Sequence, residues 1–212
     1  MTLVFNPELF QRLPVVGILR AFGRTEIDQM VPASLEGGLS NIEVTMNSPG
    51  AVDLIARCIA LAGSRANVGA GTVTDLVRLQ QALDAGASFI VTPTVVPEVI
   101  AACVRRGIPV MPGAYSPTEI QQAWELGAHC VKIFPAETLG PGYLRAIKAP
   151  LPHVSLMPTG GVSVETLGAF KKAGASAFGV GSPLFDAKQV AAANWSWFRD
   201  QAARFRQAYQ PS

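Results

Sequence analysis

The segment LEGGLSNIEV, residues 35–44, is typical of a helix end, a glycine turn and then an apolar strand. Three further segments have the same order: LDAGASFIVT (83–92), ELGAHCVKIF (125–134) and KKAGASAFGV (171–180). Glycine suits the left-handed position after a helix, and a short apolar run is typical of a strand covered on both faces. Strands of this kind that alternate with helices pair in parallel through helical crossovers.

Eight strands are predicted, because PVVGILR, NVGAGTV, IPVMPGA and VSLMPTGG have a similar character; the strands begin near residues 14, 40, 67, 88, 108, 129, 154 and 176. Helices are predicted between them, for example from Ser116 to Leu126, where Ser116 and Glu119 form a capping-box pattern, and from Ser163 onward. The pattern predicts an α/β protein, a (β/α)8 TIM barrel that occupies residues 1–212 as a single domain. An open doubly wound sheet has the same alternation and stays the alternative.

Two terminal helices are expected outside the repeat. A short one near Asn6 to Arg12 precedes the first strand, and a long one over Asn194 to Tyr209 ends the chain. The long helix carries aromatic residues that we expect to pack on the barrel or on another subunit: Trp195, Trp197, Phe198 and Phe205.

Composition narrows the class of protein. Hydrophobic residues make up 49% of the chain and charged residues 15%, which indicates a compact core. The net charge of +2 is too small for a protein that wraps nucleic acid, and no apolar run approaches the ~20 residues that cross a bilayer. The first residues lack the pattern of a signal peptide, and Cys58, Cys103 and Cys130 are too scattered for a disulfide framework. We expect a soluble cytoplasmic protein with neither nucleic-acid nor membrane partners.

Lys132 is the first candidate catalytic residue. The other four lysines fall in predicted helices or helix ends, whereas Lys132 lies in a predicted strand. The period of two places Val131 and Ile133 on one face and Lys132 on the other, toward the barrel mouth. A desolvated lysine amine has a lowered pKa and can form a Schiff base with a carbonyl group. The alternative is a structural lysine paired with a buried carboxylate.

Glu43 is the second candidate. The same parity places Ile42 and Val44 outward and Glu43 inward, together with Thr45. A partly desolvated carboxylate beside Lys132 suits general acid or base chemistry. The alternative is that Glu43 is only the counter-ion of the lysine.

Two glycine turns follow the last strands, one at Pro158–Ser163 and one at Gly179–Leu184. Glycine lets the main chain approach an anion close to a helix start, which favours phosphate binding at this end of a barrel. The only histidines are His129 and His153, and neither has the spacing of a metal ligand, so no metal or cofactor is expected.

Six segments carry a resemblance to a known family: IEVTMNSPGA (42–51), VGAGTV (68–73), VTPT (91–94), MPGA (111–114), VKIFPAE (131–137) and MPTGGV (157–162). In this order they resemble the 2-keto-3-deoxy-6-phosphogluconate/4-hydroxy-2-oxoglutarate aldolases, including the 6-phosphogalactonate branch, over residues 7–185. The resemblance implies a metal-free class I aldolase, a (β/α)8 barrel that forms a homotrimer, with Lys132 as the Schiff-base residue and Glu43 as the proton carrier. The implied reaction splits a phosphorylated keto-deoxy sugar acid into pyruvate and glyceraldehyde 3-phosphate, in the Entner-Doudoroff manner.

The substrate site follows from the same motifs. The resemblance implies that Thr72 contacts the substrate carboxylate and that Phe134 and Pro135 pack around the keto acid. It assigns phosphate to Gly160, Gly161, Gly181 and Ser182. The predicted set of substrate-binding residues is completed by Arg20, Thr45, Pro93 and Thr159.

One position departs from the family pattern. Phosphogluconate-type members commonly carry arginine where this chain has Asn47, so the carboxylate lacks its usual partner. Arg20 could supply a bidentate cation from an adjacent strand, or it could be a surface residue at a strand end. Three segments resemble the phosphogalactonate branch: GILR (17–20), which contains Arg20, NSP (47–49), which contains Asn47, and Gly140–Tyr143. In contrast, Met157–Gly161 resembles the phosphogluconate branch.

The expected function is cleavage of 2-keto-3-deoxy-6-phosphogluconate, with 4-hydroxy-2-oxoglutarate as a side substrate. One alternative is the galactonate isomer, which differs in configuration at C4. Another is a sugar-phosphate-binding barrel that is no aldolase, whether a different enzyme or a catalytically silent one. A nucleophilic Lys132 would separate the aldolase from that last class.

Overall fold

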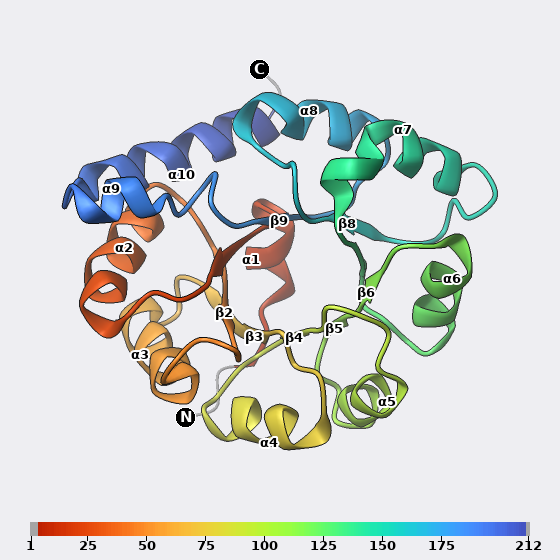
Figure 1. The fold of residues 1–212 in the computed structure, drawn as a ribbon, viewed down its shortest axis with the longest axis horizontal. Coiled ribbons are helices and arrows are strands. Elements are labelled where there is room, and N and C mark those ends of the chain that lie inside the picture. Colours follow the sequence, from red (N-terminus) through yellow and green to blue (C-terminus); the bar gives the residue numbers. More distant parts are fainter. Residues whose placement is uncertain (1–3, 211–212) are drawn as a thin grey trace.

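The computed structural model describes residues 4–210, and its strands are short, parallel and buried (Figure 1). They are β1 (Val15–Leu19), β2 (Asn41–Thr45), β3 (Asn67–Gly71), β4 (Ile90–Val91), β5 (Val110–Met111), β6 (Gly113–Ala114), β7 (Val131–Ile133), β8 (Leu156–Pro158) and β9 (Phe178–Val180). One sheet has the order β5-β4-β3-β2-β1-β9 and a second has the order β6-β7-β8. The predicted α/β class with parallel strands is confirmed.

The break between the two sheets falls at Pro112. Strands β5 and β6 are consecutive pieces of one segment on either side of this residue. Proline has no N–H group, so it cannot donate to a strand ladder, but its carbonyl oxygen still accepts from the backbone N–H of Lys132 at 2.8 Å. At the other edge, a single parallel bridge joins Thr159, directly after β8, to Gly179 in β9. The parallel strands therefore form two sheets rather than one unbroken ladder.

Helices surround these strands (Figure 1). They are α1 (Pro7–Arg12), α2 (Arg24–Glu36), α3 (Ala51–Ala62), α4 (Leu76–Asp84), α5 (Pro97–Arg105), α6 (Pro117–Glu125), α7 (Ala136–Lys148), α8 (Val164–Lys172), α9 (Ala187–Ala191) and α10 (Trp195–Tyr209). The predicted capping box is confirmed: Ser116 Oγ accepts from the N–H of Glu119 at 3.3 Å, and Glu119 Oε2 accepts from the N–H of Ser116 at 2.7 Å. Sequence patterns did not predict α9.

Alternate strand residues enter two separate clusters. Outward residues such as Ile42, Val44, Val131 and Ile133 pack against the helices. Inward residues form a smaller cluster with a side chain of α1: Phe10, Val16, Phe89, Val91, Met111, Cys130, Met157 and Ala177. Buried polar side chains lie at the carboxyl ends of several strands: Thr45 ends β2, Thr92 directly follows β4 and Thr159 directly follows β8.

The terminal helices are where the sequence predicts them. Asn6 caps α1, its side chain accepting from two backbone N–H groups of the first turn. On α10, Phe198 and Phe205 are fully buried, and Trp195 and Trp197 are partly buried against the same core. These aromatic residues therefore pack on their own chain. Within residues 4–210, no helix combines the length and the apolar character that crossing a membrane requires.

Candidate active site

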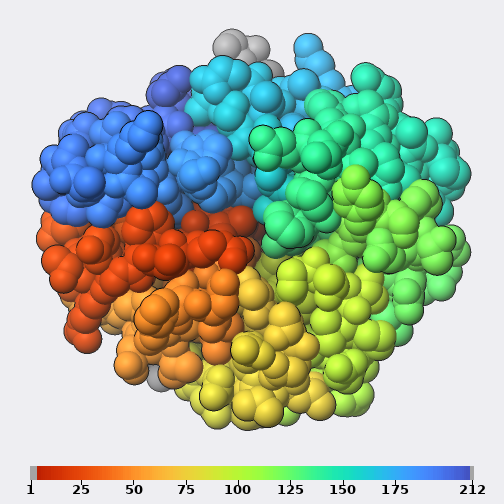
Figure 2. All heavy atoms as spheres, viewed as in Figure 1, coloured from red at the N-terminus to blue at the C-terminus, as the bar shows by residue number. Residues whose placement is uncertain are grey.

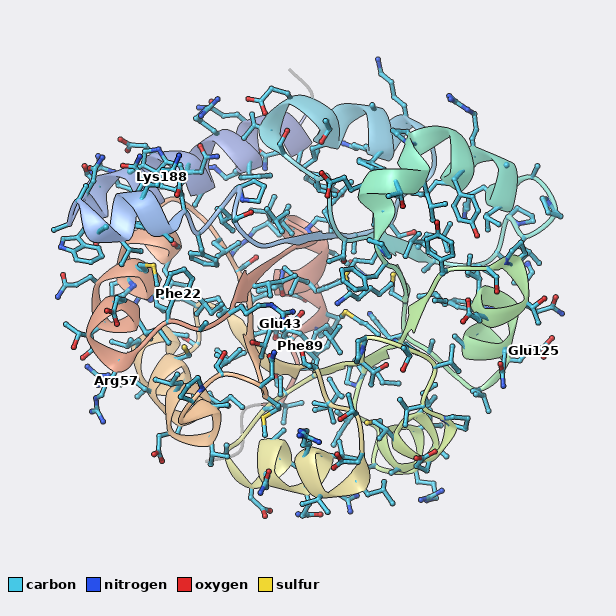
Figure 3. All side chains as sticks on the ribbon, in the orientation of Figure 1. Phe22, Glu43, Arg57, Phe89, Glu125 and Lys188 are labelled. Atoms are coloured by element: carbon cyan, nitrogen blue, oxygen red, sulfur yellow. The ribbon has the colours of Figure 1, made fainter. Side chains whose placement is uncertain are left out.

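Lys132 and Glu43 project from β7 and β2 into the space that the strands enclose. Lys132 is 4% exposed and Glu43 is 1% exposed, and their neighbours in sequence belong to the outer cluster. Figure 3 shows Glu43 near the centre of the strands, whereas Arg57, Glu125 and Lys188 lie at the periphery. The inward orientation that strand parity predicts for both residues is confirmed.

Burial changes the acid–base properties of both groups in opposite directions. Desolvation lowers the pKa of Lys132, opposed by the charge of Glu43 and reinforced by that of Arg20. Desolvation raises the pKa of Glu43, opposed by the positive charges of Lys132 and Arg20. Burial therefore moves the pKa of Lys132 down and the pKa of Glu43 up, both in the direction of neutral pH.

Neither group is locked into a structural contact. Both carboxylate oxygens of Glu43 are buried without a hydrogen-bond partner among residues 4–210. In the same part of the chain, Lys132 takes part in no ion pair. Its Nζ lies 4.9 Å from the centroid of the Phe134 ring, which is 39% exposed at the end of β7. A carbonyl compound could therefore reach the amine without displacing a salt bridge.

The residues that follow β3 shape the space beside Glu43. A methyl group on Gly71 would overlap the Glu43 carboxylate, so only glycine allows this approach. The next residue, Thr72, has a left-handed backbone with φ of 57°. A threonine in this region is strained and is held there by its surroundings, as is common at binding sites. Thr72 directly follows β3, next to the glycine that approaches the Glu43 carboxylate.

The turn after β8 has the backbone expected of an anion-binding loop. Gly160 and Gly161 have φ values of 91° and 71°, and α8 begins shortly after them. A methyl group on Gly161 would lie 2.9 Å from Cα of Glu137 at the start of α7. Glycine is therefore required both for the backbone angle and for the close approach to α7.

Thr159 precedes this turn and has an unusual side chain. It is 5% exposed, and its Oγ1 has no hydrogen-bond partner among residues 4–210. A methyl group on Gly179 would overlap that oxygen. A buried hydroxyl group without a partner is rare in folded proteins and is often explained by a function.

Arg20 directly follows β1 and lies beside the second predicted anion loop, Gly179–Leu184. It shares a cavity of about 360 Å³ with Gly181 and Ser182, which follow β9, and with Ile18, Phe22, Phe185 and Ala187. Strands β1 and β9 are neighbours, with Gly17 opposite Val180, and this pairing brings Arg20 to the glycine loop. The strand order thus joins the proposed carboxylate and phosphate residues on one side of the site.

The other predicted residues have less direct evidence. Thr45 is buried at the end of β2, and Pro93 is half-buried after β4, where its carbonyl group packs against Gly113. Among residues 4–210, no group of His, Cys, Asp or Glu has the number needed to hold a metal ion.

Ser48 is a buried residue of this region that the sequence analysis did not identify. Its hydroxyl group lies 2.9 Å from Thr45 Oγ1 and accepts a hydrogen bond from the N–H of Ala21, also at 2.9 Å. Its position in the motif MNSP was the only signal in the sequence, because its partner Ala21, which follows β1, is 27 residues away along the chain.

The chain is similar to known aldolases over most of its length. The family model for KDPG and KHG aldolase matches residues 7–200. The 2-dehydro-3-deoxy-6-phosphogalactonate aldolase of Escherichia coli (strain K12) is 36% identical over 200 residues, covering 94% of this chain and 96% of that protein. The 2-dehydro-3-deoxy-phosphogluconate aldolase of Treponema pallidum (strain Nichols) is 35% identical over 194 residues, covering 89% and 91%.

Two solved structures have the same fold. A native KDPGal structure has a TM-score of 0.85 at 36% identity, covering 93% of this chain and 94% of that one. KDPG aldolase from Legionella pneumophila, with pyruvate captured as a covalent carbinolamine intermediate, has a TM-score of 0.82 at 26% identity, covering 92% and 95%. On the family match, the identities and the shared fold, this chain belongs to the KDPG and KHG aldolase family and is a lyase.

Proposed function

We propose that the chain is a class I aldolase that cleaves 2-keto-3-deoxy-6-phosphogluconate into pyruvate and glyceraldehyde 3-phosphate. The observation that carries this proposal is the buried Lys132, with its lowered pKa and no ion pair among residues 4–210, on the same face of the strands as the buried Glu43. The carbinolamine formed by pyruvate in the Legionella pneumophila aldolase supports the same chemistry here.

The proposed reaction begins with attack of the neutral Lys132 Nζ on the C2 carbonyl carbon. Loss of water from the carbinolamine gives a protonated Schiff base, which withdraws electrons from C3. Glu43, directly or through a water molecule, accepts the proton of the C4 hydroxyl group while the C3–C4 bond breaks. Glyceraldehyde 3-phosphate leaves, and the electron pair of the broken bond forms an enamine. Protonation at C3 and hydrolysis then release pyruvate and restore the amine.

The ends of the substrate carry negative charges, and the proposed ligands are distributed accordingly. The glycine turns at Gly160–Gly161 and Gly181–Ser182 are the proposed phosphate ligands. Arg20 and Thr72 are proposed for the carboxylate, Thr45, Pro93 and Phe134 for the keto-acid chain, and Thr159 for a hydroxyl group. Support comes from the left-handed backbone of Gly160 and Gly161, the cavity shared by Arg20 and Ser182, and the unpartnered Thr159 Oγ1.

The galactonate isomer is the second candidate substrate. It is favoured by the contact of Arg20 Nη1 with Asn47 Oδ1 at 3.4 Å, in the two motifs that resemble the phosphogalactonate branch. The two named relatives act on one isomer each and are nearly equally similar to this chain. We propose 4-hydroxy-2-oxoglutarate as a side substrate, because it offers the same C2 carbonyl and C4 hydroxyl groups without the phosphate.

We infer that the two sheets form one closed (β/α)8 barrel and that the chain is a single domain. The continuity of β5 with β6 and the bridge from Thr159 to Gly179 support closure at the two places where the ladder is interrupted. Segments from all parts of the chain surround a hollow near the middle of one face (Figure 2). We also propose a cytoplasmic homotrimer that serves sugar-acid catabolism of the Entner-Doudoroff type, which the family resemblance supports.

The proposed mechanism is tested by reducing the protein with borohydride in the presence of pyruvate and locating the adduct by peptide mass spectrometry. We expect a reduced pyruvyl group on Lys132, in the presence of EDTA as in its absence, and none on Lys132→Ala. The variant Lys148→Ala, which changes a helical lysine, is the matched control and should be labelled like wild type.

Substrate choice requires a separate assay. Release of pyruvate is compared for the gluconate and galactonate isomers and for 4-hydroxy-2-oxoglutarate. A larger kcat/KM for the gluconate supports the first candidate, and a larger value for the galactonate supports the second. A folded wild-type protein that forms no adduct and releases no pyruvate would leave a phosphate-binding barrel of another function.

A further inference from the structure

A pair of hydroxyl groups links the carboxyl ends of β1 and β2. Thr45 Oγ1 and Ser48 Oγ lie 2.9 Å apart, and Ser48 Oγ accepts from the backbone N–H of Ala21 at 2.9 Å. Ser48 is 7% exposed, so this hydrogen bond is largely shielded from water. The loop after β2 thereby holds the backbone that follows β1.

The residue held in this way has a strained backbone. Ala21 has φ of 61°, in the left-handed region that residues with a side chain rarely adopt. Such a conformation persists only where surrounding contacts impose it. The hydrogen bond from its N–H group to Ser48 is a contact of that kind, and it acts on the peptide group directly after Arg20.

The same loop also contacts the other end of Arg20. Arg20 Nη1 donates to Asn47 Oδ1 at 3.4 Å, while the side chain lines the cavity that contains Gly181 and Ser182. Arg20 is otherwise exposed, and its charge acts on both Glu43 and Lys132. An exposed arginine side chain samples many rotamers. To point its guanidinium group in one direction, the protein must restrain both the backbone next to the arginine and the guanidinium group itself.

We propose that Ser48 is a positioning residue that acts through Ala21 to direct Arg20 toward an anionic group of the substrate, with Asn47 as a weaker second restraint. The proposal rests on the proposed aldolase function and deepens it. In this arrangement the loop after β2 orients a cation that follows the neighbouring strand β1.

A double-mutant cycle between Ser48 and Arg20 tests this proposal, with kcat and KM measured on the phosphorylated sugar acid. Ser48→Ala should raise KM about fivefold and change kcat less than about twofold, because the lost interaction serves binding rather than bond cleavage. In the Arg20→Ala background the same substitution should leave KM unchanged, because its effect passes through the arginine. Ser48→Thr, which keeps the hydroxyl group, should restore most of the affinity.

Two further variants keep the test decisive. Ser34→Ala removes another buried serine hydroxyl group, on α2, and should match wild type. Asn47→Ala changes an exposed side chain, so it should fold even if Ser48→Ala does not, and it should raise KM about twofold only when Arg20 is present.

An unchanged KM in both Ser48→Ala and Asn47→Ala would overturn the proposal. An equal rise of KM with and without Arg20 would also overturn it, because Ser48 would then act on structure alone. Borohydride trapping of pyruvate on the wild-type protein tests the aldolase function separately from the positioning role of Ser48. Trapping with no coupling between Ser48 and Arg20 rejects only the positioning role, whereas the absence of trapping rejects the aldolase and this role together.

Discussion

The carboxylate of Glu43 occupies the space that a side chain on Gly71 would fill. The two residues lie on neighbouring parallel strands. Glu43 pairs with Gly69, and Gly71 lies two residues further along β3, on the same inward face as Gly69. Because the carboxylate has no hydrogen-bond partner among residues 4–210, the absence of a side chain on β3 is what leaves room for its observed orientation. Gly71 therefore shapes the site without taking part in any chemistry.

Gly71→Ala should displace the Glu43 carboxylate. We expect kcat to fall about tenfold or more and the free energy of unfolding to fall by about 1–3 kcal/mol, the usual cost of overpacking. Steady-state kinetics and urea titration measure the two effects. Gly168→Ala, on α8 with open space around the added methyl group, is the control and should keep full activity. Wild-type kcat in Gly71→Ala would contradict the role assigned to Glu43.

The pH dependence of stability should report the buried Glu43. Burial raises its pKa above 4.5, so the folded protein retains a proton that the unfolded chain releases. Below pH 4.5 this group contributes fully to stability, and the contribution is lost as the pH rises through the folded-state pKa. The positive charges of Lys132 and Arg20 make the rise in pKa smaller, so they reduce this contribution. Each unit of difference in pKa corresponds to about 1.4 kcal/mol.

Glu43→Gln should therefore gain stability relative to wild type as the pH rises from about 4.5. Urea titrations over a series of pH values measure the difference in the free energy of unfolding. The exposed Glu98 on α5 provides the control, since Glu98→Gln should follow the wild-type curve. A difference between Glu43→Gln and wild type that does not change with pH would reject the raised pKa.

Gly161→Ala should separate phosphate binding from carbonyl chemistry. The added methyl group is disfavoured at φ of 71° and would press on Glu137, so the loop should shift. We expect KM for the phosphorylated substrate to rise about tenfold, while borohydride still traps pyruvate on Lys132. Gly107→Ala, at φ of 66° with open space, carries a similar backbone strain far from this loop and should leave KM unchanged. A KM unaffected by Gly161→Ala would remove this turn from the phosphate site.

Asn67 should contribute to stability without affecting catalysis. Its side chain donates to Asn6 O and to Asn41 Oδ1, both at 2.9 Å, and accepts from the N–H of Asn6 at 2.7 Å. These bonds hold the start of α1 against β2 and β3 at the end of the strands remote from Lys132. Asn67→Ala leaves buried polar groups unpaired and should cost about 2–3 kcal/mol of unfolding free energy with kcat unchanged. A loss below about 0.5 kcal/mol would show that water replaces the amide.

The cysteines should be unreactive in the folded protein. Burial raises the pKa of Cys58 and Cys130 to about 12 and that of Cys103 to about 11, so the reactive thiolate is scarce at neutral pH. Iodoacetamide at pH 8 should leave the native protein unmodified and alkylate all three thiols in urea, as intact mass spectrometry would detect. Rapid labelling of a cysteine in the native protein would contradict its burial.

Most strand positions could be predicted from local patterns. Each of the eight predicted starts lies within two residues of an observed strand, and the capping boxes define α6 and α8. The break at Pro112 was missed, although proline in a strand signals it. Helix α9 was missed because it has only five residues and none of them is buried, so no periodic apolar face marks it in the sequence.

The inward orientation of Lys132 and Glu43 follows from the sequence, because alternation along a strand is a local property of the backbone. Which strand ends meet is a non-local property, and the tertiary structure alone places Arg20 beside Ser182 and brings Ala21 to the hydroxyl group of Ser48. The acid–base character of the site is also tertiary. It depends on how completely distant segments exclude water from Lys132 and Glu43, and a single strand cannot desolvate its own side chains.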